Sequence, residues 1–129
     1  MPHIIVEYSA NLDGRLDVKA LVDDLHAAAA ASGLFEIPAI RTRAVRRDVF
    51  RVADGDARNG FVHVTARVRQ GRTVEQRKAL GQALLAAANR RLDGVFASQP
   101  LALTIEVHEI DPEMTFRRNS IRERATTAA

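Results

Sequence analysis

The chain begins "MPHIIVEYS", so a proline stands directly after the first Met and directly before a run of strand-forming residues. Removal of Met1 would make Pro2 the first residue, and a terminal proline carries a free secondary amine. A free α-amino group has a reference pKa of about 7.7–8.0, close to the value that suits a general base. Pro2 is therefore a candidate for proton-transfer chemistry. The alternative is that this proline only marks the start of a strand.

Other residue types that carry chemistry do not fall into familiar arrangements. The histidines have no metal-ligand spacing: His3, His26, His63 and His108. Ser9 and Ser98 lack a nucleophile elbow, and paired-carboxylate hydrolysis by Glu106 and Glu109 needs a sugar cleft that a small domain does not offer. The chain has no cysteine, which excludes disulfides and thiol chemistry. We expect neither a metal nor a cofactor.

The basic residues are almost all arginines, because Lys19 and Lys78 are the only lysines. Binding to nucleic acid is one explanation. However, the net charge is only +3, 16 acidic residues are interspersed, and one Tyr and five Phe are available for base stacking. Since arginine binds carboxylates through two parallel hydrogen bonds, a small polyanionic ligand is the other explanation. We expect no nucleic-acid partner.

The spacing of apolar residues predicts the elements that must position these groups. The first half reads as a strand over residues 3–9, a helix that Asp17 caps and Gly33 ends, and a strand from Ala39 to about Phe50. The second half repeats this order. A strand "FVHVTARVR" precedes a helix with a Thr73–Gln76 capping box, ending at Gly94, and "LALTIEVHEI" forms a last strand.

The chain therefore reads as two βαβ units in one domain, 1–129, with pseudo-repeats over about 1–58 and 59–120 and a frayed tail over 121–129. Alternate apolar residues on both sides of the strands predict self-association of the sheet. No apolar run approaches the roughly 20 residues needed to cross a bilayer, and no secretory signal is recognisable. We expect a cytoplasmic protein that does not bind membranes.

Several motifs, in the same order, resemble one family of the tautomerase superfamily, the 5-carboxymethyl-2-hydroxymuconate Δ-isomerases. They are "MPHIIVEYSANL", "GLFEIPAIRTRA", "ADG", "NGFVHVTARVRQGR" and "EVHEIDPEMTFRRNSI". The segment "GRTVEQRKAL" also resembles the shorter 4-oxalocrotonate tautomerases. The resemblance covers nearly the whole chain except "RERATTAA". It implies an α+β (α/β) fold of tandem βαβ units, a four-stranded mixed sheet with two helices on one face, and a homotrimer.

The resemblance also implies a reaction and its residues. The reaction is a cofactor-independent 1,3-proton shift that converts 5-carboxymethyl-2-hydroxymuconate, a dienol with three carboxylates, to its 2-oxo isomer in homoprotocatechuate catabolism. The family's proline base maps to Pro2, and its substrate-binding arginines map to Arg72 and to Arg41 or Arg43. Burial and neighbouring arginines would lower the pKa of the Pro2 amine. The alternatives are a tautomerase for another 2-hydroxydienoate or an α-keto acid, or a non-catalytic basic oligomeric binding module.

Overall fold

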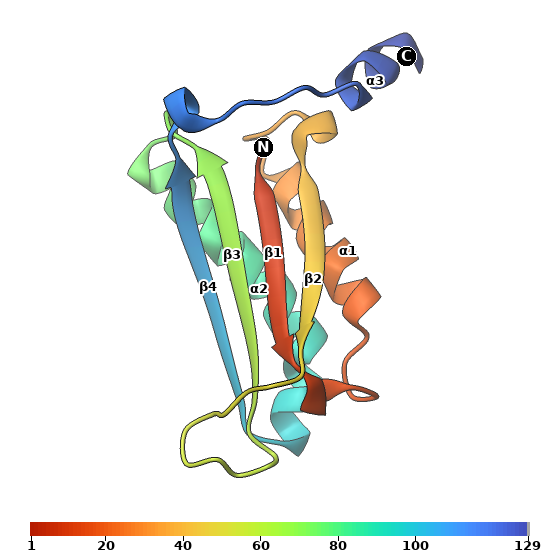
Figure 1. Ribbon diagram of the computed structural model, residues 1–129, viewed down its shortest axis with the longest axis vertical. Coiled ribbons are helices and arrows are strands. Elements are labelled where there is room, and N and C mark those ends of the chain that lie inside the picture. Colours follow the sequence, from red (N-terminus) through yellow and green to blue (C-terminus); the bar gives the residue numbers. More distant parts are fainter. Residues whose placement is uncertain (129) are drawn as a thin grey trace.

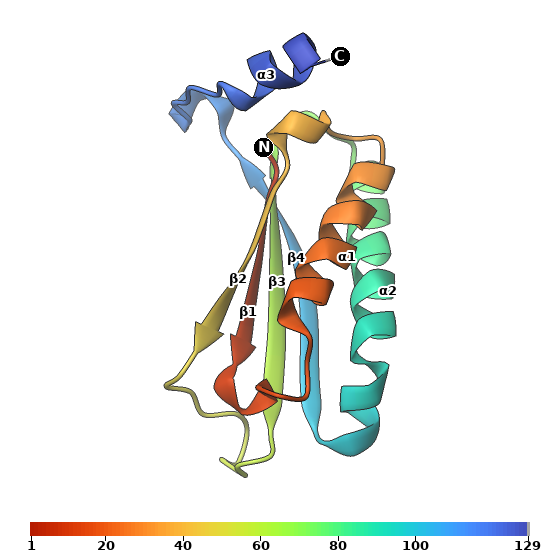
Figure 2. The ribbon, with the colours of Figure 1, turned by 90° about the vertical axis from the view of Figure 1, so that its right-hand side faces the viewer.

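The computed structural model describes residues 1–128, which form one four-stranded mixed sheet with two long helices on one face (Figures 1 and 2). The strands and long helices are β1 (His3–Ser9), α1 (Val18–Ala31), β2 (Arg41–Arg47), β3 (Gly60–Arg69), α2 (Val74–Ser98) and β4 (Leu101–Ile110). Short 3-10 turns occupy Ala10–Leu12, Ile37–Ala39 and Pro112–Met114. This architecture confirms the predicted tandem βαβ fold. None of the described helices is both long and apolar enough to cross a membrane.

The strand order β2-β1-β3-β4 places β1 in the middle of the sheet. β1 runs parallel to β2 and antiparallel to β3, and β3 runs parallel to β4. In this register His3 lies between Arg41 of β2 and Arg67 of β3, while Arg69 pairs with Ile110. The starts of β1 and β2 and the ends of β3 and β4 therefore share one edge. The N-terminus lies at this edge (Figure 1).

Local hydrogen bonds explain where the two long helices begin. The Asp17 carboxylate accepts a hydrogen bond from the backbone N–H of Ala20 at 3.0 Å, as the sequence predicts. Thr73 and Gln76 form the predicted capping box: the Thr73 hydroxyl accepts from the Gln76 N–H at 3.1 Å, and the Gln76 side chain accepts from the Thr73 N–H at 2.9 Å. Both caps satisfy N–H groups that a helix start leaves unpaired.

The predicted end of the second helix at Gly94 is wrong, because α2 continues to Ser98. Gly94 does not adopt a positive φ, so it forms no left-handed cap. Val95, one residue on, is buried in the core, and this burial favours a further helical turn. Pro100, just beyond Gln99, then prevents continuation. The second strand is also shorter than the predicted 39–50, because pairing with β1 ends at Ser9–Arg47.

The hydrophobic core lies between the sheet and the two helices. Its largest fully buried side chains come from all these layers: Ile4, Val6, Leu12, Leu21, Leu25, Val62, Val64, Val68, Leu80, Leu84 and Leu92. Burial alternates along β1 and β3, so that every second residue faces away from the helices. That other face is open in Figure 2.

The prediction of apolar residues on both sheet faces holds only in small part, because Ile5 of β1 and Phe61 of β3 lie on the open face among mostly polar side chains. The open face carries ion pairs and polar contacts: Arg47 with Glu7 at 2.9 Å, His108 with Glu106 at 3.3 Å, and His63 with Glu106. In the strand "FVHVTARVR" the buried apolar residues Val62, Val64, Ala66 and Val68 face the helices, whereas Phe61 lies on the open face with His63 and Thr65. The argument for self-association from an apolar second face therefore does not hold.

Most of the tail that the sequence leaves without a predicted element is helical: Ile121–Ala128 form α3, and Ala129 lies outside the described residues. The segment between β4 and α3 crosses the sheet edge that holds the N-terminus (Figures 1 and 2). Asn119 in this segment donates a side-chain hydrogen bond to the Pro38 carbonyl at 3.4 Å, next to the start of β2. The C-terminal segment therefore covers the edge where the candidate residues gather.

Candidate active site

Pro2 is fixed at the edge of the sheet by burial and by the backbone. Its side chain is fully buried, and its carbonyl oxygen accepts a hydrogen bond from the Arg41 N–H at 3.1 Å. This bond extends the pairing of β1 with β2 by one residue. The proline ring further restricts φ. The Pro2 nitrogen therefore has a defined place, and Met1 extends from it into a hollow.

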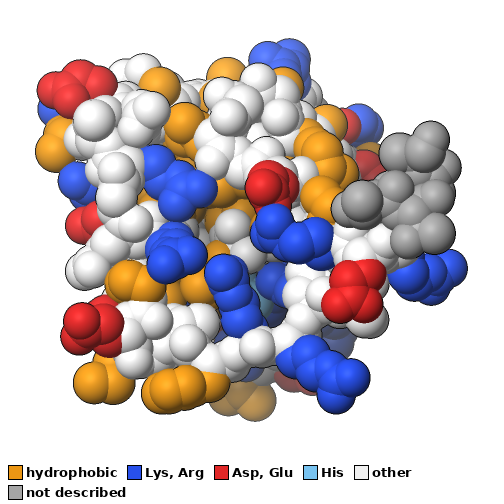
Figure 3. Space-filling view, turned by 90° about the horizontal axis from the view of Figure 1, so that it is seen from above, with side chains coloured by type: hydrophobic (Ala, Val, Ile, Leu, Met, Phe, Trp, Pro, Cys, Tyr) orange, Lys and Arg blue, Asp and Glu red, His pale blue; other side chains and the backbone are white. Residues whose placement is uncertain are grey.

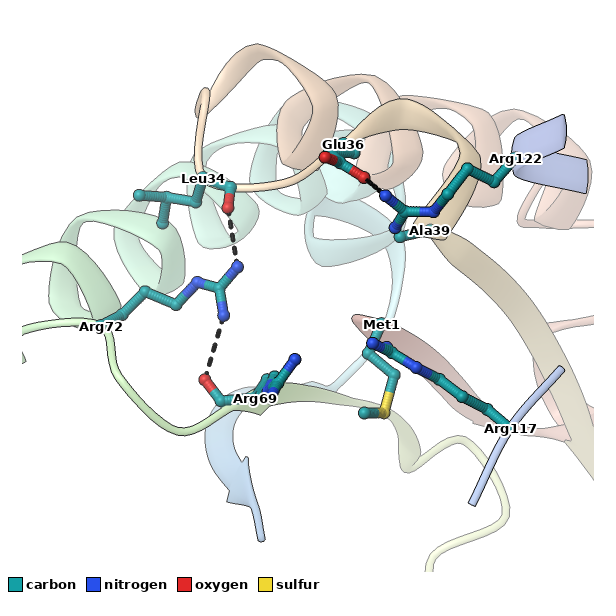
Figure 4. Close-up of a pocket in the computed structure, with 8 residues that line it drawn as sticks. All are labelled: Met1, Leu34, Glu36, Ala39, Arg69, Arg72, Arg117 and Arg122. Atoms are coloured by element: carbon teal, nitrogen blue, oxygen red, sulfur yellow. Dashed lines mark hydrogen bonds and ion pairs between the residues drawn. The ribbon is translucent and has the colours of Figure 1, made fainter. Parts of the chain in front are cut away.

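The hollow consists of three cavities of about 320, 270 and 110 Å³, each lined by both Met1 and Arg117. The largest is also lined by Leu34, Glu36, Ala39, Arg69, Arg72 and Arg122 (Figure 4). Arg41 and Asn119 line the second. Seen from this end, Lys and Arg side chains surround a central hollow (Figure 3). We refer to Arg41, Arg69, Arg72, Arg117 and Arg122 as the arginine ring.

Arg72 is held firmly on one side of the largest cavity. Its guanidinium donates to the Leu34 carbonyl at 2.8 Å and to the Arg69 carbonyl at 3.1 Å (Figure 4). The same group lies over the Phe35 ring, 4.9 Å from the centroid, which adds a cation–π interaction. Gly71 makes the tight turn before Arg72 possible, because its φ of +123° is one that L residues rarely adopt.

The structure separates the two alternatives on β2. The Arg41 guanidinium donates to the Ala39 carbonyl at 3.3 Å and lines a cavity together with Met1. Arg43 lies one pleat further along the strand, where its guanidinium contacts the His3 ring nitrogen at 3.1 Å, and it lines none of the three cavities. Of the predicted arginines, Arg41 and Arg72 therefore gather around the N-terminus and Arg43 does not.

Three members of the arginine ring were not predicted. Arg69 is the last residue of β3, and Arg117 and Arg122 follow β4. Arg122 forms an ion pair with Glu36, the only acidic residue among those that line the three cavities. The segment "FRRNSI" belonged to the family resemblance, yet nothing in its spacing indicated that the C-terminal segment returns to the N-terminus.

The surroundings lower the pKa of the terminal amine. In the chain with Met1 present, burial and the positive charges of Arg41, Arg117, Arg122 and Arg72, in that order, lower the pKa of the Met1 amine from 8.0 to about 6. Both effects disfavour the ammonium form. Burial and the nearby Arg43 likewise lower the pKa of His3. An amine at this edge is therefore available as a base at neutral pH.

The arrangement provides one base and several anion-binding groups. A neutral amine accepts a proton, while guanidinium groups bind carboxylates and stabilise negative charge that develops on oxygen. The described residues contain no group of three or more His, Cys, Asp or Glu side chains that could hold a metal ion. The chemistry that these residues support is proton transfer on a small anion.

Comparison with known proteins identifies the family. The family model described as 5-carboxymethyl-2-hydroxymuconate isomerase matches residues 2–125. The 5-carboxymethyl-2-hydroxymuconate Delta-isomerase of Escherichia coli is 32% identical over 121 residues, which are 94% of this chain and 96% of that protein.

Solved structures of similar proteins support the same family and fold. A 5-carboxymethyl-2-hydroxymuconate isomerase from Deinococcus radiodurans R1 has a TM-score of 0.90 and 30% identity, over 96% of this chain and 93% of its own. The Q0 fused 4-OT protein, described as a symmetric trimer, has a TM-score of 0.65 and 20% identity over 91% and 93% of the two chains, a likeness of fold alone. The sequence match, the fold and the gathering of arginines around the N-terminus lead to one conclusion: the chain belongs to the 5-carboxymethyl-2-hydroxymuconate isomerase family.

Proposed function

We propose that this chain is a cofactor-independent isomerase that converts 5-carboxymethyl-2-hydroxymuconate to its 2-oxo isomer in homoprotocatechuate catabolism. The observation that carries the proposal is the terminal amine with a lowered pKa inside the arginine ring. Membership of the family supplies the substrate. The reaction moves a proton from the 2-hydroxyl oxygen to a carbon of the dienol while the double bonds shift, so it needs no redox partner.

In this proposal Met1 is removed and the Pro2 nitrogen is the base. A free amine there would lie at the sheet edge where Met1 now meets the arginine charges, so the same causes would lower its pKa. The neutral amine takes the hydroxyl proton and, as the ammonium, returns a proton to carbon. Pro2 is a rigid carrier, since its ring is buried and its carbonyl oxygen is bonded to the Arg41 N–H.

Arg41 and Arg72 have different proposed roles. Arg72 is held by two carbonyl groups and the Phe35 ring, which suits a guanidinium that orients a carboxylate with little loss of side-chain entropy. The positive charge of Arg41 has the largest effect of any nearby residue on the amine. This proximity suits stabilisation of the dienolate charge that builds next to the base.

We further propose that the enzyme is a homotrimer. The open sheet face is not covered by any described element of the chain, and the Q0 fused 4-OT protein, of the same fold, is described as a trimer. Because that face carries many charged and polar side chains, contacts between subunits would include ion pairs and hydrogen bonds.

We predict that retention of Met1 abolishes most of the activity and leaves the fold intact. Acylation by Met1 turns the proline nitrogen into an amide whose lone pair is delocalised. Loss of general-base catalysis should lower kcat by about 10²- to 10⁴-fold. Preparations with and without Met1, verified by mass spectrometry, would be compared by the ultraviolet change of the dienol and by circular dichroism. Equal activity of the two preparations would rule out Pro2 as the base.

We predict that Arg41→Gln and Arg72→Gln each lower kcat/KM. The expected loss of transition-state stabilisation is about 1.5–3 kcal/mol, the value of a hydrogen bond to a charged group. Loss mainly in KM would indicate carboxylate anchoring, and loss in kcat would indicate dienolate stabilisation. Arg43→Gln is the matched control, because Arg43 lies on the same strand but lines none of the cavities. Wild-type kinetics in both test variants, or an equal loss in the control, would refute these roles.

For the assembly, we predict sedimentation of the active enzyme at the mass of three chains, each of 14.2 kDa. Contacts through ion pairs should weaken at high ionic strength, because salt screens exposed charges. The measurement is analytical ultracentrifugation at low and high salt, with activity assayed in the same buffers. A monomer that keeps full activity at assay concentration would overturn the proposed trimer.

A further inference from the structure

The members of the arginine ring differ in whether their guanidinium groups already have a hydrogen-bond or ion-pair partner. Arg72 and Arg41 donate to backbone carbonyls, and Arg122 pairs with Glu36. By contrast, the guanidinium groups of Arg69 and Arg117 make no hydrogen bond or ion pair with any side chain or backbone group that the structure describes. Two arginines that line a cavity therefore retain all of their donors.

These two arginines come from separate parts of the chain and meet at Met1. Arg69 ends β3, and Arg117 lies in the segment that crosses the sheet edge after β4. Both line the largest cavity and also the smallest, which is otherwise formed by Met1, Pro112 and Thr115. Figure 4 shows them on either side of Met1, while Arg72 lies beyond Arg69. A small anion in this space would reach both guanidinium groups.

The charge around the cavity favours an anion at this place. Positive charges held close together repel one another, and the effect of Arg117 on the pKa of the Met1 amine is one expression of this repulsion. Glu36 is the only carboxylate among the cavity-lining residues, and Arg122 already occupies it. A ligand carboxylate would offset the two remaining charges through charge-assisted hydrogen bonds.

The proposed substrate has three carboxylates, and the roles of Arg41 and Arg72 leave at least one of them without a partner. We propose that Arg69 and Arg117 bind the carboxylate of the carboxymethyl arm and thereby make the site selective for tricarboxylate over dicarboxylate dienols. This inference rests on the proposed function, because it assigns one part of that substrate to one part of the same site. Arg69 and Arg117 are here specificity-determining residues: neither exchanges a proton with the substrate, and the effect of the Arg117 charge on the pKa of the amine is the same for both substrates, so it cancels in their ratio.

The test compares two substrates in the same ultraviolet assay: 5-carboxymethyl-2-hydroxymuconate and 2-hydroxymuconate, which lacks the carboxymethyl arm. The measured quantity is the ratio of their kcat/KM values in the wild type, Arg117→Gln and Arg69→Gln. Loss of a charge-assisted contact that only the tricarboxylate makes should lower this ratio by about 10- to 100-fold in each variant, mainly through the KM of the tricarboxylate.

Arg118→Gln is the matched control. Arg118 follows Arg117 in the chain and is exposed, and its substitution removes the same charge. It lines none of the three cavities. Its ratio should equal that of the wild type. An equal fall of the ratio in this control would assign the effect to net charge and overturn the inference.

The remaining outcomes separate the inference from the function on which it rests. A wild type that isomerises the tricarboxylate, combined with an unchanged ratio in Arg117→Gln and Arg69→Gln, overturns the inference and leaves the proposed function intact. A wild type that isomerises neither dienol overturns both. Arg69 and Arg117 lie in different parts of the chain. If circular dichroism shows that one variant misfolds, the substrate ratio of the other variant still tests the inference.

Discussion

The pairing of β1 with a parallel and an antiparallel neighbour is the constraint on which the site depends. Because β2 starts where β1 starts and β3 ends there, the residue before β1 lies between Arg41, the first residue of β2, and the last residues of β3. A shift of the β1–β2 register would break the bond between the Arg41 N–H and the Pro2 carbonyl. The position of one nitrogen relative to Arg41 and Arg72 is therefore set by the backbone hydrogen bonds of the sheet.

The second feature is an excess of positive charge at this edge. Five arginines line the cavities around Met1, four of them lower the pKa of its amine, and among the described residues only one carboxylate lines the same cavities. In the absence of an anion this arrangement is electrostatically unfavourable, and after burial of the amine it is the second reason that the amine loses its proton more easily. The same arginines are the groups that would bind a polycarboxylate. The arginine charges thus contribute both to activation of the base, together with its burial, and to recognition of the substrate.

The sequence predicted those parts that depend on local chemistry. β1 and β4 match their predicted ranges to the residue, and both helix caps form as predicted, since apolar alternation and capping act over a few residues. The helix end at Gly94 could not be predicted, because the burial of Val95 depends on tertiary packing. The polarity of the second face was misjudged because periodicity alone does not tell which residues of a strand meet the helices.

The candidate site was predictable in part for a similar reason. Pro2, Arg41 and Arg72 lie in motifs of the family, and the structure places all three at one edge. Arg69 and Arg117 could not be selected among so many arginines, because only the path of the chain after β4 brings Arg117 back to the N-terminus. The choice between Arg41 and Arg43 likewise required the strand register.

The most direct test of this account is the pKa of the Pro2 nitrogen, measured by ¹⁵N NMR in protein that carries labelled proline and lacks Met1. The account predicts a pKa below the roughly 8 of an ordinary α-amino group. It also predicts that the ascending limb of kcat/KM against pH follows the same value, and that Arg41→Gln raises both together. A Pro2 nitrogen that titrates at or above about 8, with the activity limb at a different pH, would contradict the claim that the arginine ring prepares this amine as the base.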